Sequence, residues 1–220
     1  MRMGIRKIKP NKLSITGQFY SDKMEDTIKF ESNLEKDYYI WCEFNSCVTD
    51  YIYQPLSIKY INEHNVNAIY TPDVLVKYLD SRQTNLIEIK YSDDLKKNFE
   101  LYKPKFNAAI KYCRERDWKF EVITESIRTP YLSNVKFLLT YNKEIIEDEF
   151  KYKMLNRMGK LKHFTPKSFV EDFAKTEYLR GVTLRYFWTL ALKREIICDL
   201  TIPLNMNTKF YLSESNYEKY

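Results

Sequence analysis

Glycine and histidine are scarce in this sequence, and their scarcity excludes several kinds of enzyme. The 220 residues include four glycines, none close to another, and two isolated histidines. Loops that cradle phosphates and turns that bind dinucleotides need clustered glycines, so both are excluded. No Gly-x-Ser-x-Gly elbow occurs, and two histidines far apart argue against a Ser-His-Asp triad. Any chemistry must therefore come from carboxylates and lysine.

Paired cysteines and long apolar runs are also missing. The four cysteines form no Cys-x-x-Cys pair, which excludes a recognisable zinc site and a disulfide framework. No apolar run approaches the roughly 18 residues that a membrane helix needs. The N-terminus lacks the apolar stretch and small-residue cleavage site of a signal peptide. We therefore expect a cytoplasmic protein that has no membrane association.

Positive charge is concentrated at the N-terminus. The net charge is +6, and residues 1–13 carry five basic side chains and no acidic one. The rest of the chain is nearly neutral, with 31 basic and 30 acidic side chains. A basic arm over residues 1–20 suits a segment that follows a phosphate backbone, and a solvated tail is the open alternative.

Carboxylates share the apolar face of the first predicted helix. Spacing of three and four residues predicts a helix over residues 24–44, on which Leu34 and Tyr38 lie on one face with Glu31 and Glu35. Burying an unpaired carboxylate is costly. We therefore expect these side chains to have a cation, a hydrogen-bond donor or a metal ion as partner.

The remaining pattern predicts two domains. Branched and aromatic residues predict strands at 48–53, 57–61, 68–78, 86–91 and 118–124, and a helix over 95–116 that Pro104 kinks or splits. Pro72 predicts a bulge or an edge position in the third strand. This order indicates an α/β domain over residues 21–145. Residues 146–220 are predicted to form helices followed by a hairpin, either as a small winged-helix-like domain or as a helical extension that caps the first domain.

Three chemically useful side chains are predicted to converge on neighbouring strands. Asp73 ends a Pro-Asp step, and alternation puts Glu88 and Lys90 on one face of the next strand. Two carboxylates suit Mg²⁺, and a lysine beside them can orient water or balance charge on a phosphate. Taken singly, a Glu-x-Lys pair is usually a solvated face and a Pro-Asp step is usually a turn. Taken together with Glu35, they indicate metal-assisted hydrolysis of a phosphodiester.

These motifs resemble the TnsA family, the endonuclease subunits of Tn7-like transposons. The resemblance covers most of the chain and is more specific in its N-terminal part. The motifs that carry it are Phe30-Glu31-Ser32-Asn33-Leu34-Glu35, Phe44-Asn45-Ser46-Cys47-Val48, Tyr53-Gln54-Pro55, Tyr70-Thr71-Pro72-Asp73-Val74-Leu75-Val76, Leu86-Ile87-Glu88-Ile89-Lys90 and, more weakly, the segment 184–208.

The resemblance implies a restriction-endonuclease-like mixed sheet flanked by helices, followed by a small winged-helix-like domain. It implies Mg²⁺-dependent hydrolysis, with Mn²⁺ as a substitute, of the 5′ (non-transferred) strands at transposon ends in double-stranded DNA. A separate transposase would process the 3′ ends, and an ATP-dependent regulator would contact the C-terminal domain. The expected setting is the bacterial cytoplasm.

By motif, the resemblance makes Glu35, Asp73, Glu88 and Lys90 the catalytic residues, and the three carboxylates among them the metal ligands. Some relatives have glutamine at the position of Glu88, which implies that this acid is less essential than Asp73. Glu31 and Glu43 are possible supporting carboxylates. Two alternatives stay open: a stand-alone restriction or repair nuclease of the same fold, and a DNA-end scaffold that does not cut.

Overall fold

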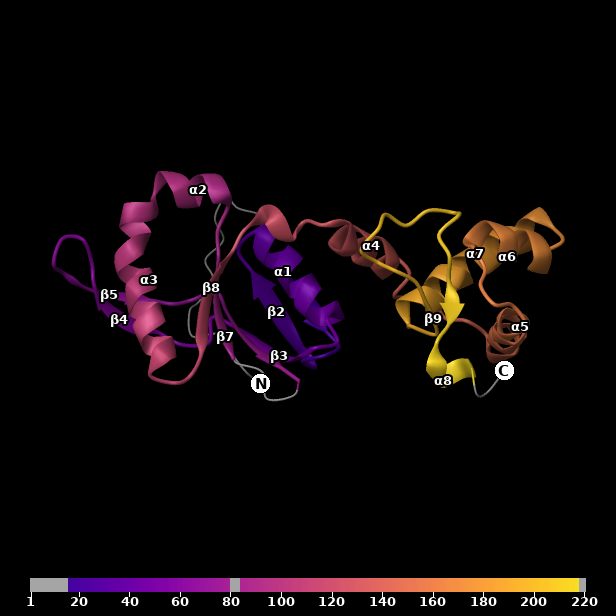
Figure 1. Cartoon of the computed structure of the whole chain (residues 1–220), viewed down its shortest axis with the longest axis horizontal. Helices are drawn as coiled ribbons and strands as arrows, with labels where there is room; N and C mark the ends of the chain where they lie inside the picture. The colour runs from indigo at the N-terminus through magenta and orange to yellow at the C-terminus, as the bar shows by residue number, and fades with distance from the viewer. Residues whose placement is uncertain (1–15, 80–83, 218–220) are drawn as a thin grey trace. The chain divides into compact units, whose positions relative to one another are not determined.

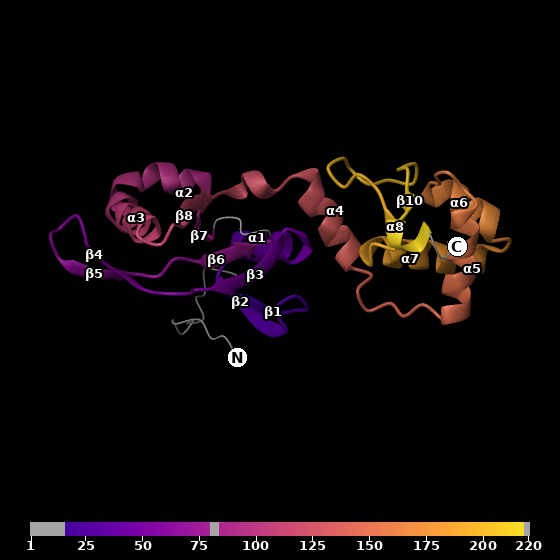
Figure 2. The same ribbon diagram turned by 60° about the horizontal axis from the view of Figure 1, so that its bottom comes forward.

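The chain forms two compact units that divide after Arg128. The computed structural model describes residues 16–79 and 84–217, so most of the predicted basic arm lies outside the described residues. Figures 1 and 2 show the course of the chain in two views. The sequence placed the boundary between its two domains at residue 145, whereas the structure assigns helix α4 (Pro130–Leu139) to the second unit.

A mixed four-stranded sheet forms the centre of the first unit. Its strand order is β3-β6-β7-β8, in which β3, β6 and β7 are antiparallel neighbours and β8 runs parallel to β7. The strands are β3 (Val48–Tyr53), β6 (Val74–Tyr78), β7 (Asn85–Ile89) and β8 (Lys119–Ile123). All five residues of β7 are buried, as expected for a strand covered on both faces. The predicted α/β class with a mixed sheet flanked by helices is confirmed, and it is consistent with a restriction-endonuclease-like fold.

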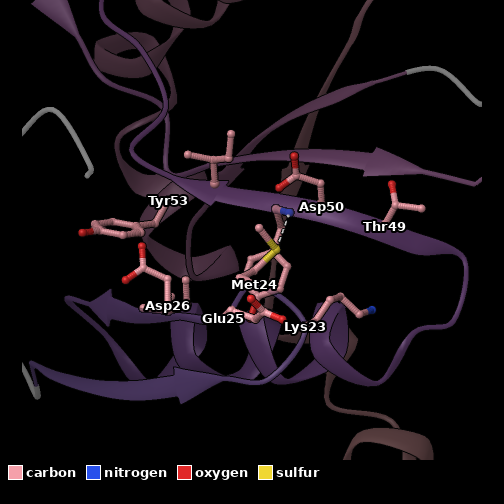
Figure 3. Close-up of a pocket in the computed structure, with 10 residues that line it drawn as sticks. Lys23, Met24, Glu25, Asp26, Thr49, Asp50 and Tyr53 are labelled. Carbon is pink, nitrogen blue, oxygen red and sulfur yellow. Dashed lines mark hydrogen bonds between the residues drawn. The ribbon is translucent and has the colours of Figure 1, made fainter. Parts of the chain in front are cut away.

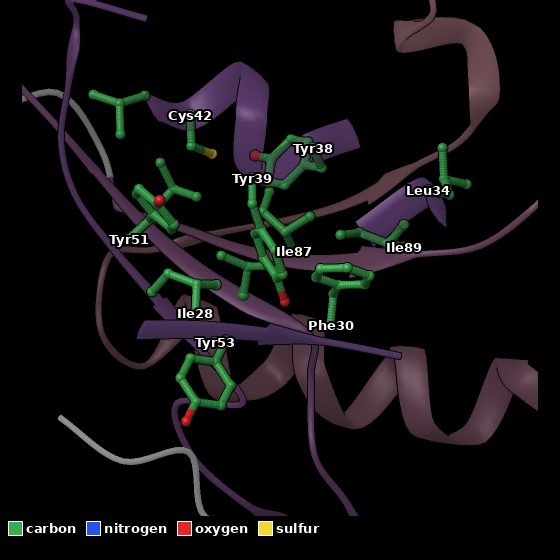
Figure 4. Close-up of a cluster of buried hydrophobic side chains, with 13 residues drawn as sticks. Ile28, Phe30, Leu34, Tyr38, Tyr39, Cys42, Tyr51, Tyr53, Ile87 and Ile89 are labelled. Atoms are coloured by element: carbon green, nitrogen blue, oxygen red, sulfur yellow. The ribbon is translucent and has the colours of Figure 1, made fainter. Parts of the chain in front are cut away.

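One face of this sheet packs against helix α1 (Asn33–Phe44) and the hairpin of β1 (Gly17–Ser21) and β2 (Asp26–Phe30). Figure 4 shows this cluster of buried side chains. Its members come from β2, α1, β3, β6 and β7: Ile28, Phe30, Leu34, Tyr38, Tyr39, Cys42, Val48, Tyr51, Tyr53, Val74, Val76, Ile87 and Ile89. The odd-numbered residues of β7 therefore face α1.

The other face packs against helix α3 (Phe99–Arg114) and the hairpin of β4 (Ile58–Ile61) and β5 (Asn67–Tyr70). Leu75 and Leu86 contribute to this second cluster, together with Ala109 and Cys113 of α3. The alternation along β7 consequently directs Glu88 toward α3. In Figure 1, α1 and α3 lie on opposite sides of the sheet.

Three predictions of secondary structure in this unit were wrong. The helix expected from residue 24 begins at Asn33, because Ser32 caps it and residues 26–30 pair with β1. The strand expected over 68–78 is two strands in different sheets, which are separated at Pro72. The break in the second helix falls at Asn98, between α2 (Ser92–Lys97) and α3, and Pro104 lies inside α3.

Helices dominate the second unit. After α4 come α5 (Asp148–Gly159), α6 (Pro166–Phe173) and α7 (Glu177–Leu192), then the short strands β9 (Ile196–Ile197) and β10 (Tyr211–Leu212) and helix α8 (Glu214–Tyr217). β9 and β10 pair antiparallel over two residues. The predicted order of helices followed by a strand pair is present, and the winged-helix-like designation remains a prediction.

An aromatic core holds this unit together. Phe169, Phe187 and Phe210 are fully buried, and the rings of Phe187 and Phe210 meet edge to face at 5.0 Å. Asn134 of α4 donates to the carbonyls of Leu200 and Ile202, which ties α4 to the segment after α7. No helix in the described part of either unit is long and apolar enough to cross a membrane.

Candidate active site

The sheet holds the backbone of Asp73 firmly. Asp73 immediately precedes β6, and its N–H donates to the carbonyl of Ile87 at 3.1 Å. Its own carbonyl accepts the N–H of Gln54 at 2.7 Å. The start of β6 therefore lies beside the end of its antiparallel neighbour β7, where Lys90 follows Ile89. The side chain also joins the strands, since Oδ2 accepts the N–H of Ile89 at 2.6 Å.

Lys90 lies between two carboxylates at this end of the sheet. Its Nζ is 3.0 Å from Oε1 of Glu88 and 3.9 Å from Oδ2 of Asp73. The backbone N–H of Lys90 donates to Ile123 of β8 at 3.0 Å, so the residue is anchored in the sheet. The structure therefore brings together three of the four residues predicted from the sequence.

Two further side chains hold Glu88, which is only 2% exposed. The hydroxyl of Tyr70, at the end of β5, donates to Oε2 at 2.6 Å. Nζ of Lys105, on α3, donates to Oε1 at 2.9 Å. Neither residue could be predicted from the sequence, because a tyrosine in a strand and a lysine in a helix carry no signal of their own.

Glu35 caps its own helix. Its Oε1 accepts the hydroxyl of Ser32 at 3.0 Å and its Oε2 accepts the N–H of Glu31 at 2.8 Å, while Ser32 accepts the N–H of Glu35 at 3.1 Å. Ser32 therefore caps the helix, and the Glu35 side chain folds back onto Ser32 and the residue before it. The carboxylate also interacts electrostatically with Lys90 and with Asp73.

The electrostatics of the site favour an added cation. Burial raises the pKa of Asp73 well above its usual value, and the negative charges of Glu88 and Glu35 raise it further, while Lys90 and the N–H of Ile89 oppose the shift. Burial likewise raises the pKa of the Glu35 carboxyl. Nearby Asp73 and Glu88 raise the pKa of Lys90 against the effect of its burial, so Lys90 is protonated at neutral pH.

The carboxylate oxygens of the site are of the type that Mg²⁺ prefers, but they are not arranged as a preformed metal site. Carboxylate oxygens are the ligands that this ion prefers, and the surplus of negative charge around Asp73 would be relieved by it. Within residues 16–79 and 84–217, no three acidic, histidine or cysteine side chains converge closely enough to hold a metal ion. Three protein donors occupy Glu88 and two occupy Glu35.

The two possible supporting carboxylates have structural partners. Glu31 accepts a hydrogen bond from the side-chain amide of Gln54 at 3.3 Å. Glu43 accepts the hydroxyls of Ser21 and Tyr51 and the backbone N–H of Lys23. Glu43 therefore holds the β1–β2 hairpin against the sheet.

A separate cavity opens beside strand β3. It has a volume of about 630 Å³, and its lining comes from the β1–β2 turn, from β2 and from β3 (Figure 3). The lining residues are Lys23, Met24, Glu25, Asp26, Ile28, Thr49, Asp50, Tyr51, Ile52 and Tyr53. None of the four predicted catalytic residues is among them.

Comparison with known proteins divides the chain within a few residues of the structural boundary. Residues 45–125 match the family model described as TnsA-like endonuclease N terminal, and residues 126–200 match the one described as TnsA endonuclease C terminal. The first match includes Asp73, Glu88 and Lys90, whereas Glu35 lies before it. No curated protein matches the chain.

Proposed function

The chain belongs to the TnsA family of transposition endonucleases, and from this premise we propose that it hydrolyses the 5′ strands at transposon ends in a Mg²⁺-dependent reaction. The observation that supports this most directly is the convergence of Asp73, Glu88 and Lys90 at one end of the sheet. A separate transposase would process the 3′ ends, and an ATP-dependent regulator would bind the second unit.

Asp73 is the best placed metal ligand. Within the described residues, its side-chain contacts all reach Oδ2, which leaves Oδ1 available to a cation. Each oxygen of Glu35 accepts one hydrogen bond and retains a second acceptor site, so Glu35 can complete the set from α1. When bound there, Mg²⁺ would polarise the scissile phosphate and make water a better nucleophile.

Lys90 supplies the positive charge that the reaction needs beside these carboxylates. Its ammonium group is protonated and its backbone is anchored in the sheet, so it can donate to a phosphate oxygen with little reorganisation. During hydrolysis, the oxygen of water adds to phosphorus and the water gives up a proton, one P–O bond breaks, and the leaving oxygen takes up a proton. Lys90 stabilises the negative charge that develops on the phosphate oxygens.

Strand-specific cleavage of an end-labelled transposon-end duplex tests this function. Wild type and Asp73→Ala are compared with and without the transposase, in Mg²⁺ and in EDTA. We expect 5′-strand cutting that requires the transposase and Mg²⁺ and that disappears in the variant.

Two other results would each replace the proposal with an alternative. Cutting of arbitrary DNA without any partner would identify a stand-alone nuclease. Binding of DNA or of the transposase with no cutting under any condition would identify a scaffold.

A further inference from the structure

Lys105 and Tyr70 both donate hydrogen bonds to the Glu88 carboxylate, and neither belongs to the predicted set of catalytic residues. We propose that these two residues form a clamp, and that the clamp makes Glu88 a positioning residue for Lys90 and not a ligand of the metal. The clamp consists of Tyr70 and Lys105, which hold the Glu88 carboxylate between them. This inference deepens the proposed function and rests on it, because it concerns how the same site is arranged.

Counting the hydrogen bonds shows how little of Glu88 is left for a metal ion. An ionised carboxylate has about four acceptor sites. Oε1 of Glu88 accepts from Lys90 at 3.0 Å and from Lys105 at 2.9 Å, and Oε2 accepts from Tyr70 at 2.6 Å. The residue is 2% exposed, so the remaining site faces protein. A metal ion would have to displace one of these donors.

Lys105 is held in place by aromatic rings. Its Nζ lies 4.5 Å from the ring centre of Tyr102, 4.9 Å from that of Tyr70 and 5.4 Å from that of Phe106. Ring faces attract an ammonium group, and the side chain is only 16% exposed. Helix α3 is fixed to the sheet by the buried side chains of Ala109 and Cys113. Lys105 is therefore already in position when DNA arrives.

The clamp determines where Lys90 points. Because Tyr70 and Lys105 fix both oxygens of Glu88, Oε1 gives Lys90 a rigid acceptor on the side of the sheet that faces α3. Nζ of Lys90 also donates to the carbonyl of Ile89 at 3.0 Å and lies 3.9 Å from Oδ2 of Asp73. Lys90 is consequently kept next to the best placed metal ligand.

The first test measures single-turnover cleavage by the full chain with its transposase. Lys105→Met keeps the length and apolar packing of the side chain but removes the ammonium group. We expect a loss of about 10–100-fold in the cleavage rate, as is typical when a partner of a metal-site residue is removed. Lys105→Arg should recover most of that loss. Lys103→Met is the matched control, because Lys103 is an exposed residue of the same helix. Wild-type cleavage by Lys105→Met would overturn the clamp.

The second test measures how Mg²⁺ raises the melting temperature. If Glu88 is not a ligand, Glu88→Gln should show the same half-saturating Mg²⁺ concentration as wild type, whereas Asp73→Asn should lose the response. Lys105→Met should keep it. If Glu88→Gln loses the response as fully as Asp73→Asn does, Glu88 binds the metal and the proposal is wrong.

A third measurement separates failure of the clamp from failure of the proposed function. In EDTA and without DNA, Glu88→Gln and Lys105→Met should each lower the melting temperature, and the double variant should lower it by less than the sum of the two. Purely additive effects would disprove the clamp whether or not the protein cuts DNA. Non-additive effects in a protein that never cleaves DNA would support the clamp and refute the proposed nuclease.

Discussion

Replacing Asp73 by asparagine should make the metal-free protein more stable. The Asp73 side chain is about one-fifth exposed, and burial together with Glu88 and Glu35 raises the pKa of its carboxyl. The folded state therefore binds the proton more tightly than the unfolded state does. Stability from this group is fully present below the unfolded pKa near 3.8 and is lost as the pH rises through the higher folded value. Asparagine removes that loss, and its side-chain oxygen can still accept the N–H of Ile89.

The size of the effect follows from the size of the pKa shift. Each unit by which the folded pKa is raised costs the ionised form about 1.4 kcal/mol. For a chain of this size, 1 kcal/mol corresponds to about 2–4 °C in melting temperature. Asp73→Asn should thus melt several degrees above wild type at pH 8 in EDTA, and the gap should close near pH 4.

Calorimetry at both pH values, with EDTA or with millimolar Mg²⁺, measures these shifts. Mg²⁺ should stabilise wild type and leave Asp73→Asn unchanged. Asp93→Asn, an exposed position on α2, controls for the change in net charge. The reasoning is refuted if Asp73→Asn is less stable than wild type at pH 8 in EDTA, because the ionised carboxylate would then stabilise the fold.

Three other variants test separate parts of the structure. Lys90→Ala should bind DNA and assemble with its partners yet lose 5′-strand cleavage; unchanged cleavage in the strand assay would disprove the assignment. Ser32→Ala removes the cap of α1 and should cost about 1 kcal/mol in urea unfolding, and an unchanged midpoint would mean that the bond from the N–H of Glu31 to Glu35 suffices. Arg128→Ala removes the 2.8 Å ion pair with the buried Asp37, which should cost about 1.5–3 kcal/mol; Arg128→Lys should recover part of this, and a neutral result would show that other groups compensate for the guanidinium.

The central strand and its chemistry could be predicted because alternation along a strand is strict. Leu86 and Glu88 share one face, as expected, and Ile87 and Ile89 share the other. Asp73 was predicted beside them because two consecutive β-type segments usually pair. Glu35 was correctly placed on a helix, although its capping bonds were not foreseen.

Other features could not be predicted because a short apolar pattern can fit both the spacing of a strand and that of a helix. Ile28 and Phe30 alternate as a strand, but Ile28 also fits the helical spacing that continues through Leu34. The capping residue Ser32 is the local signal that decides between them. Lys105 could not be singled out among the lysines of its helix, since its role depends on a carboxylate 17 positions away in the sequence.

The β4–β5 hairpin is a suitable site for attaching a tag or a fluorophore. Its turn is exposed and is organised locally, with the side chain of Asn62 accepting the N–H groups of His64 and Val66. The other end of the hairpin carries Tyr70, which donates to Glu88. Exposed turns of this kind tolerate inserted sequence well. A peptide tag or a fluorophore introduced between His64 and Asn65 could therefore report on assembly with DNA while leaving the sheet that carries the carboxylates as it is.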